Sequence, residues 1–376
     1  MRYARHKCAE LLEHAGITLN GSAPWDIQVH DDRLYWRVLR DKHLGLGEAY
    51  MDGWWDCQRL DMCIDRILRS GVRKAANRSL AHGALAVLSV FTNRQKLSRS
   101  RQIAEHHYDL DNDLFLSFLD PYNQYSCGFF NGDCSLEEAQ ETKLALTCRK
   151  LELSRDDSLL DIGCGWGGFA KYAAEHFGCH VTGVNISEEQ IAFARQDCQG
   201  LPVDIVEQDY RDITDTYDKV VSIGMFEHVG PKNYESFMRV VQRCLKEDGI
   251  FLLHTIGSNK SRLNVDPWIS KYIFPNGVLP SVSQIGRAAE PYFIMEDWHN
   301  LGPHYDKTLM AWNSRFQEAW PRLRKKYSRR FKRMWEYYLQ SCAGAFRSRS
   351  IQLWQVVFSK GRCPQPECRL AVQQGD

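Results

Sequence analysis

The sequence predicts an α/β protein built on a largely parallel sheet, and three observations support that prediction. Short apolar segments typical of strands alternate with helical segments from about Glu105 onward. A glycine-rich turn at residues 163–168 joins one of these strands directly to a helix. The chain has 376 residues, 44% of them hydrophobic and 25% charged, which is a globular composition with enough length for two domains.

Three regions are expected along the chain. Residues 1–75 are aromatic-rich and predict a smaller N-terminal domain, and residues 76–104 predict a basic linker. From Arg66 to Arg101 there are nine Lys and Arg residues and no acid, although the net charge of the whole chain is only +1. Residues 105–376 are expected to form a larger α/β domain, because the alternation of strands and helices falls there.

The elements of this larger domain are predicted by hydrophobic periodicity and by capping signals. Ser135 and Glu138 have capping-box spacing and open a helix, and Ser187 with Gln190 opens another. A further helix is expected at residues 232–246. The strands alternate with helices, which implies right-handed crossovers and parallel pairing. The expected strands are 158–162, 180–185, 203–206, 218–223, 250–256, 292–297 and 351–358.

The glycine turn predicts a ligand-binding loop after the strand that carries Asp161. The glycines of residues 163–168 fit both the GxGxxG spacing of dinucleotide-binding folds and the DxGxGxG spacing of methyltransferases. A tight turn without a ligand is the third interpretation. Both ligand classes commonly carry an acid at the end of the second strand, where this chain has Asn185. Gln190, one helical turn further, can supply the polar contact instead.

Several segments match one known pattern. They are LDIGCGWGG, YDKVVSIGMFEHVGPKNY, FLLHTIG, VDPWISKYIFPNG, QYSC and YLQSCAGAFR, with GITLNGSAPWDIQV and LGLGEAYMDGWW near the N-terminus. Through them the chain resembles the cyclopropane-fatty-acyl-phospholipid synthases, from about Cys8 to Gly361. The resemblance implies the S-adenosylmethionine-dependent methyltransferase fold, whose seven-stranded sheet is mostly parallel. It also implies S-adenosylmethionine as methylene donor and an unsaturated phospholipid acyl chain as acceptor.

The reaction of that family places definite demands on a site. Methyl transfer to a cis alkene leaves a carbocation, and a base must then remove a proton from the new methyl group so that the ring closes. The resemblance implies that bound bicarbonate is this base. Its expected ligands are Cys127, Glu227, His254, the backbone at Ile256, and Tyr305, while Cys342 is expected as a small packing residue close by. Taken alone, a glutamate after a strand is usually solvated and a histidine in an apolar strand is usually part of the core.

The resemblance also implies which residues bind S-adenosylmethionine. Tyr125 and Ser126 resemble the pair that closes over the cofactor, and Asp209 and Tyr210 follow the third strand where adenine contacts lie. The expected cofactor-binding residues are Tyr125, Ser126, Asp161, Gly163, Cys164, Gly165, Asn185, Ile186, Gln190, Asp209 and Tyr210. No metal is expected, because the 13 cysteines have no zinc-ligand spacing and read as reduced thiols.

The expected location is the cytoplasm, with peripheral attachment to the inner face of the membrane. No apolar run approaches the length of a transmembrane helix, and the first residues lack a signal-peptide core. Residues 322–349 carry ten Lys and Arg residues against one acid, together with an aromatic stripe at helical spacing. That segment either lies on anionic headgroups or packs its stripe on the core. The N-terminal domain is expected to position the enzyme on phospholipid and is a candidate for homodimer formation.

Two other functions stay open at this point. One is a lipid acyl-chain methyltransferase that does not close the ring, which differs in the mass of its product. The other is a cofactor-binding lipid carrier, which would not turn over S-adenosylmethionine. A nucleic-acid partner is not expected, because the sequence shows no recognisable RNA- or DNA-binding module.

Overall fold

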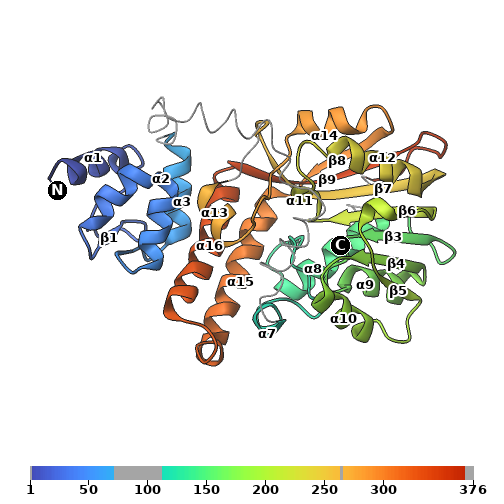
Figure 1. Cartoon of the computed structure of the whole chain (residues 1–376), viewed down its shortest axis with the longest axis horizontal. Coiled ribbons are helices and arrows are strands. Elements are labelled where there is room, and N and C mark those ends of the chain that lie inside the picture. Colours follow the sequence, from blue (N-terminus) through green and yellow to red (C-terminus); the bar gives the residue numbers. More distant parts are fainter. Residues whose placement is uncertain (1, 72–111, 263–265, 369–376) are drawn as a thin grey trace. The chain divides into compact units, whose positions relative to one another are not determined.

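The computed structural model describes residues 2–71, 112–262 and 266–368, which form two compact units (Figure 1). One unit, here called the helical unit, holds residues 2–71, 266–275 and 305–351. The other, here called the sheet unit, holds residues 112–262, 276–304 and 352–368. The division is therefore not sequential, whereas the sequence led us to expect one boundary region between residues 75 and 105. The predicted linker at 76–104 lies outside the described residues.

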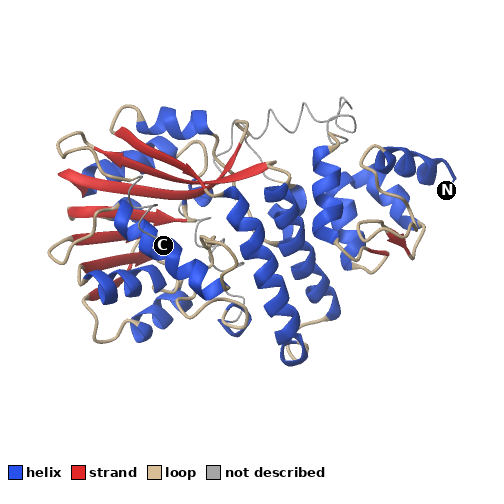
Figure 2. Ribbon diagram, turned by 180° about the vertical axis from the view of Figure 1, so that it is seen from behind, coloured by secondary structure: helices blue, strands red, loops and turns tan. Residues whose placement is uncertain are grey.

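The sheet unit contains seven strands in one sheet, with helices on both of its faces (Figures 1 and 2). The strand order is β5-β4-β3-β6-β7-β9-β8. The first five of these pair in parallel, and β8 pairs antiparallel with β9. The strands are β3 (Ser158–Ile162), β4 (His180–Asn185), β5 (Val203–Glu207), β6 (Tyr217–Ile223), β7 (Leu245–Ser258), β8 (Ile294–Asn300) and β9 (Ile351–Ser359).

Each expected strand is present, and β7 is longer than predicted because it continues on both sides of residues 250–256. The helices and turns between the strands include the two capped helices that the sequence predicts. Ser135 forms a complete capping box with Glu138, but Ser187 occupies its N-cap position without a side-chain cap hydrogen bond. The helical elements are α7 (Asn112–Phe115), α8 (Leu136–Lys150), α9 (Gly168–Phe177), α10 (Glu188–Asp197), η3 (Tyr210–Asp212), α11 (Phe226–Val229), α12 (Tyr234–Cys244) and α14 (Val282–Ala289).

Alternating side chains of the central strand separate two apolar cores. Leu159 of β3 packs with residues of α8 and α9, whereas the next residue, Leu160, packs with residues of α12 and α14. Both side chains are fully buried. This alternation is what a strand covered on both faces requires, and it explains the nearly continuous apolar sequence of β3.

The helical unit is built from segments that are far apart in sequence. Its elements are α1 (Arg2–Glu13), β1 (Gln28–Val29), α2 (Arg33–Met51), β2 (Trp55–Asp56), α3 (Leu60–Arg69), α13 (Pro267–Tyr272), most of α15 (Gly302–Leu323) and α16 (Arg329–Arg347). Helix α16 crosses α3 so closely that a Cβ on Gly344 would lie 2.6 Å from the carbonyl oxygen of Asp61. The late helices therefore complete the core of the N-terminal segment.

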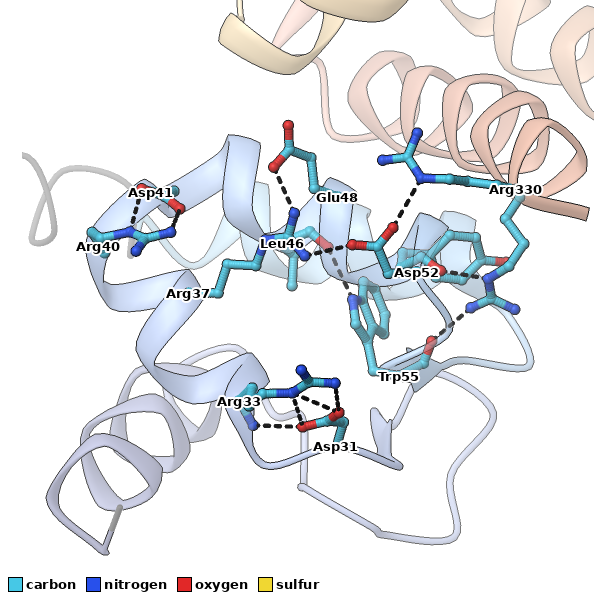
Figure 3. Close-up of polar contacts among 12 residues, drawn as sticks. Asp31, Arg33, Arg37, Arg40, Asp41, Leu46, Glu48, Asp52, Trp55 and Arg330 are labelled. Carbon is cyan, nitrogen blue, oxygen red and sulfur yellow. Dashed lines mark hydrogen bonds and ion pairs between the residues drawn. The ribbon is translucent and has the colours of Figure 1, made fainter.

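Ion pairs also join these separated segments (Figure 3). Arg37 of α2 donates to Glu48 at 2.7 Å and to Asp52 at 2.6 Å, and Arg330 of α16 donates to Asp52 at 2.9 Å. Glu48 also accepts from Lys271 of α13 at 2.6 Å. The charges that this unit removes from water are thus paired with one another, as buried charges must be.

The aromatic stripe at residues 323–339 packs inside the helical unit. Leu323, Trp335, Tyr338 and Leu339 are all less than 5% exposed. These four residues therefore pack on the core, whereas Tyr327, Phe331 and Met334 of the same stripe are half-buried. No helix among residues 2–71, 112–262 and 266–368 combines the length and apolarity needed to cross a membrane.

Candidate active site

A pocket lies at the carboxyl ends of strands β3, β4 and β6, the edge at which open α/β sheets bind ligands. All eleven residues that the sequence suggests for cofactor binding line it. They come from the loop before α8, the glycine turn, the end of β4 with the start of α10, and the segment after β5: Tyr125, Ser126, Asp161, Gly163, Cys164, Gly165, Asn185, Ile186, Gln190, Asp209 and Tyr210. The structure thus gathers this set at one place.

The glycine turn provides the floor of the pocket because side chains cannot be accommodated there. Gly163 has a φ of +85°, which disfavours any other residue, and a Cβ would approach Met225 to 2.9 Å. At Gly168, the first residue of α9, a Cβ would lie only 1.7 Å from the carbonyl oxygen of Tyr122. Glycine at this position lets the loop that carries Tyr125 and Ser126 close against the start of the helix.

Asn185 and Gln190 interact with each other at the position where an acid is usual. The Asn185 amide donates to Gln190 Oε1 at 2.9 Å and to the carbonyl oxygen of Gly165 at 3.2 Å, and its own oxygen accepts from the N–H of Ile186. These bonds fix the geometry of the glycine turn relative to β4. A ligand would meet a neutral, mutually bonded amide pair here instead of a carboxylate.

Asp209 and Tyr210 form the wall after β5. Asp209 Oδ1 accepts from Arg211 Nε at 2.8 Å and caps the short helix η3. The ring of Tyr210 lies 5.4 Å from that of Phe237 between centroids, and burial raises the pKa of its hydroxyl to about 12. The wall therefore offers a rigid aromatic surface beside a paired carboxylate.

Beneath the pocket lies a lysine that sequence reasoning missed. Lys143 of α8 is fully buried, and its ammonium donates to Gln124 Oε1 and to Ser126 Oγ, the latter at 3.0 Å. Burial lowers the pKa of Lys143, and nearby carboxylates, Asp120 first and then Asp161, oppose that shift. Burial likewise raises the pKa of Asp161, and the charge of Lys143 opposes it.

The signal for this lysine was present in the sequence as a polar stripe along α8. Gln140, Lys143, Thr147 and Lys150 recur at helical spacing, and all four are fully buried. Polar residues at such spacing ordinarily mark the solvated face of a helix. Only the tertiary structure shows that this face is directed inward, where its side chains bond to the loop at residues 124–126 and to strands β8 and β9.

Glu227 forms the most unusual group near the pocket. It lies on α11 directly after β6, is 6% exposed, and accepts a 2.6 Å hydrogen bond from the backbone N–H of Ile256 through Oε1. Among the residues that the structure describes, its Oε2 atom has no hydrogen-bond partner. Burial raises the pKa of Glu227 to about 7, and the Ile256 N–H opposes that shift. The structure thus joins two of the expected catalytic residues, although the Ile256 N–H is already bonded to the carboxylate.

His254 lies on the same strand as Ile256, two residues before it. Its ring is 1% exposed, Nδ1 lies 3.4 Å from Gln355 Nε2, and Nε2 has no partner among the described residues. Burial, together with Lys143 and Lys150, lowers the pKa of His254 well below its usual value. The imidazole is therefore neutral near pH 7.

The remaining three expected catalytic residues are distributed over both units. Cys127 is fully buried in the sheet unit, and its Sγ donates to the carbonyl oxygen of its neighbour Gly128 at 3.1 Å. Tyr305 and Cys342 belong to the helical unit. The ring of Tyr305 packs 4.6 Å from that of Phe346, and burial raises the pKa of Cys342 to about 12, so this thiol is not a nucleophile.

The described ranges contain no group of three or more His, Cys, Asp or Glu side chains arranged to hold a metal ion. The described cysteines are all free thiols, and most are buried. The site therefore consists of a pocket lined by polar and apolar residues around the glycine turn, and of a buried acid and a buried imidazole that each have one atom without a hydrogen-bond partner among the described residues.

Comparison with known proteins identifies this arrangement. The family described as "Mycolic acid cyclopropane synthetase" matches residues 95–356. The cyclopropane-fatty-acyl-phospholipid synthase of Escherichia coli K12 is 55% identical over 352 residues, covering 94% of this chain and 92% of that protein. The tuberculostearic acid methyltransferase UfaA1 of Mycobacterium tuberculosis is 32% identical, covering 86% of this chain and 80% of its own.

A solved structure supports the same assignment. The crystal structure of mycolic acid cyclopropane synthase CmaA1 complexed with SAH and CTAB is 32% identical to this chain and superposes with a TM-score of 0.65. The match covers 69% of this chain and 98% of that one. The sheet unit thus has the S-adenosylmethionine-dependent methyltransferase fold that the motifs implied. The chain is an S-adenosylmethionine-dependent enzyme that belongs to the mycolic acid cyclopropane synthetase family.

Proposed function

We propose that this enzyme transfers a methylene group from S-adenosylmethionine to the cis double bond of unsaturated phospholipid acyl chains and so forms cyclopropane fatty acids. The extent of its similarity to the E. coli synthase supports this proposal, since 94% of the chain is covered at 55% identity. The observation that carries it is Glu227, a buried carboxylate whose Oε2 has no partner in the described chain. A buried carboxylate oxygen without a hydrogen bond costs free energy of folding unless a bound ligand donates a hydrogen bond to it.

The pocket residues fit the cofactor. The glycine turn leaves its backbone accessible, the paired amides of Asn185 and Gln190 can meet ribose hydroxyls, and Tyr210 offers an aromatic surface for a base. When bound, S-adenosylmethionine supplies an electrophilic methyl group on a sulfonium. The protein's part is to orient that group and exclude water from the alkene.

The buried groups beside the pocket also fit bicarbonate, which would supply a base. Glu227 Oε2 can accept the hydroxyl of the anion, and a protonated His254 Nε2 can donate to one of its oxygens. The Ile256 N–H is bonded to Glu227, so its first role is to orient that carboxylate. The resemblance adds Cys127 and Tyr305 to the proposed set and gives Cys342 a packing role.

The proposal is tested with the purified full-length enzyme, S-adenosylmethionine and vesicles of cis-unsaturated phospholipid. We expect cyclopropane lipids by mass spectrometry, release of S-adenosylhomocysteine, and calorimetric binding of S-adenosylmethionine but not of NAD. Binding of NAD alone, or binding of S-adenosylmethionine without turnover, contradicts the proposal. Added bicarbonate should raise the activity of bicarbonate-depleted enzyme, and no response would remove the anion from the reaction.

A methyltransferase that does not close the ring is the second candidate. The similarity to a tuberculostearic acid methyltransferase over 86% of this chain favours keeping it. Without a reductant, a methyl-branched product formed by loss of a different proton is an alkene with the same mass as the cyclopropane lipid. Mild catalytic hydrogenation adds two hydrogens to the branched alkene and leaves the cyclopropane intact, so mass spectra recorded after that treatment distinguish them. Whether ring closure follows methyl transfer depends on rapid loss of a proton, which is the step that the buried groups near the pocket would assist.

We further propose that the N-terminal segment positions the enzyme on phospholipid at the membrane and contributes to self-association as a homodimer. Two large aromatic side chains of this segment are exposed, Tyr3 at 64% and Trp36 at 50%. Trp and Tyr favour the boundary between headgroups and acyl chains. Arg33 and Arg40 of α2 are exposed as well, each paired with a neighbouring aspartate, and they would have to exchange these partners for anionic headgroups.

This proposal requires the full chain, because a protein that starts near residue 100 would leave α13, α15 and α16 without their packing partners. We expect Trp36→Ser to weaken binding to anionic vesicles by about 5-fold, and added salt to weaken it further. Leu116→Ser, an exposed apolar residue of the sheet unit, is the matched control. Equal vesicle binding by both variants would show that the N-terminal segment does not make the contact, and light scattering of the same samples reports the oligomeric state.

A further inference from the structure

A chain of buried hydrogen bonds leads from helix α8 to His254, and its direction is fixed at its first member. The hydroxyl of Thr147 lies 2.8 Å from the carbonyl oxygen of Lys143, one helical turn earlier. A carbonyl oxygen can only accept, so the hydroxyl hydrogen is committed to it. Thr147 Oγ1 can then serve its other neighbours only as an acceptor.

The next member is Gln355 of β9, whose amide orientation follows from that constraint. Gln355 Nε2 lies 3.1 Å from Thr147 Oγ1, and since Oγ1 must accept, the amide nitrogen must face it. The opposite orientation would set two oxygens against each other unless Thr147 gave up its bond to Lys143, whereas the assigned orientation leaves Gln355 Oε1 without a partner among the described residues. One N–H of Gln355 is thus assigned to Thr147, and the second remains.

That second N–H faces His254. The same Gln355 nitrogen lies 3.4 Å from His254 Nδ1, and all three side chains are at most 1% exposed, which leaves no bulk water to substitute. An amide N–H opposite Nδ1 requires Nδ1 to be the acceptor nitrogen. In a neutral imidazole the single ring proton then lies on Nε2.

We propose that Gln355, held by Thr147, is a positioning residue that fixes His254 as the tautomer with its proton on Nε2. Nε2 is the ring atom that has no partner in the described chain, so the tautomer turns this atom into a donor available to a ligand. The inference rests on the proposed function for its catalytic meaning, because a donor is what an anionic base beside Glu227 would need. The tautomer itself does not depend on that function.

The surroundings of His254 keep its imidazole neutral. The ring then has a single proton, and the tautomer determines which nitrogen can donate a hydrogen bond. Lys143 and Lys150, both buried on α8, disfavour an imidazolium, in addition to the effect of burial. Lys150 is itself paired with Asp297 at 3.2 Å and lies 3.1 Å from His299 Nδ1. A neutral histidine with the proton on Nδ1 would instead present a lone pair to an anion and repel it.

The direct test is nuclear magnetic resonance of the full-length protein labelled with ¹⁵N-histidine, with His254 assigned through His254→Gln. We expect a pyridine-like Nδ1 and a pyrrole-like Nε2 in the unmodified chain. In Gln355→Glu a carboxylate replaces the amide opposite Nδ1, and we expect the proton to move to Nδ1 or the ring to become doubly protonated. Gln352→Glu, on the same strand but the opposite face, is the matched control and should leave the His254 resonances unchanged.

Kinetics supply the second measurement. Gln355→Glu should lower kcat by about 10–100-fold, the range for a lost supporting hydrogen bond, while calorimetry shows unchanged affinity for S-adenosylmethionine. Thr147→Val should have a smaller effect of the same kind, and Thr147→Ser should restore both the resonances and kcat. A pyrrole-like Nδ1 in the unmodified protein, or an unchanged tautomer in Gln355→Glu, would overturn the inference. If the expected tautomer is found in an enzyme that forms no cyclopropane lipid, the proposed function fails and the tautomer assignment stands.

Discussion

Glu48 of the helical unit and Glu227 of the sheet unit are both buried, at 9% and 6% exposed, yet their surroundings are opposite. The Glu48 carboxylate accepts hydrogen bonds from Lys271 at 2.6 Å, Tyr272 at 2.8 Å and Arg37 at 2.7 Å. Burial favours protonation of Glu48, but the bonds from Lys271, Tyr272 and Arg37 outweigh it and lower its pKa to about 2. Glu48 is stabilising when it is charged.

Glu227 has one backbone N–H on one oxygen and no described partner on the other, so burial dominates and raises its pKa to about 7. Glu227 therefore costs stability when it is charged. The comparison shows that burial alone does not determine the role of a carboxylate. In a unit with a structural role the buried charges are paired. A site that must bind a ligand and react keeps a hydrogen-bonding atom without a protein partner.

The largest effect that we expect is the loss of turnover in Glu227→Gln, which tests the functional role of the carboxylate in the sheet unit. Glu227→Gln keeps the size of the side chain and an acceptor for the Ile256 N–H, but it removes the charge. We expect turnover to fall by about 10²-fold or more, equivalent to roughly 3 kcal/mol of transition-state stabilisation, with cofactor affinity nearly unchanged. Steady-state kinetics and calorimetry measure the two quantities. Turnover close to normal would exclude Glu227 from the reaction.

The same substitution in the helical unit should damage stability instead. Glu48→Gln removes the carboxylate that pairs with Lys271 and leaves Arg37 with Asp52 alone, and we expect a loss of about 2–3 kcal/mol in the free energy of unfolding at pH 7. Glu48 has a lowered pKa, so its contribution is present above about pH 4.5 and disappears as the pH falls toward 2. Urea unfolding at pH 7 and at pH 3 checks this. An equal deficit at both values would mean that charge is not the cause.

The pH dependence of stability should have the opposite sign for Glu227. A carboxyl with a raised pKa contributes most below its unfolded value of 4.5 and loses that contribution as the pH rises through about 7. Glu227→Gln, although inactive, should therefore be more stable than the unmodified enzyme at pH 8, by about 1–2 kcal/mol, and similar to it at pH 4.5. Urea unfolding at both pH values measures it, and a variant that is less stable at pH 8 would break the comparison.

The smallest effect is expected at an exposed ion pair of the helical unit. Arg40 and Asp41 lie 2.7 Å apart, but the arginine side chain is 77% exposed (Figure 3). We expect Asp41→Asn to change the free energy of unfolding by no more than about 0.5 kcal/mol, because solvent screens such pairs. A loss as large as that of Glu48→Gln would show that pairing matters in this unit regardless of burial.

Local signals predicted most of the fold of the sheet unit. The strands and helices, the capping box at Ser135 and the glycine turn are each specified by residues that lie close together in the sequence. They could therefore be predicted without tertiary information. The gathering of the eleven pocket residues followed because parallel strands bring their carboxyl ends to one edge. The roles given to those residues remain proposals.

What escaped prediction depended on which surface a segment meets. The polar stripe of α8 and the aromatic stripe near Trp335 have the pattern of exposed and membrane-facing helices, yet both are buried by segments distant in sequence. Gln355 sits within an apolar strand where nothing local signals a partner, and its partner Thr147 lies 208 positions away. The grouping of residues 305–351 with the N-terminal helices could not be predicted for the same reason. The hydrophobic pattern of a segment does not indicate which distant segment it contacts.

The close crossing of α3 and α16 has a consequence for biosynthesis. The ribosome completes α1, α2 and α3 before it makes the sheet unit, but it makes α16, the helix that covers α3, only after most of the sheet unit. The apolar surface of the N-terminal helices must therefore stay exposed, or be shielded by a chaperone, while the sheet unit is being made. Maturation then runs against the order of synthesis, since helices made before the sheet unit reach their native packing only after most of that unit has been made.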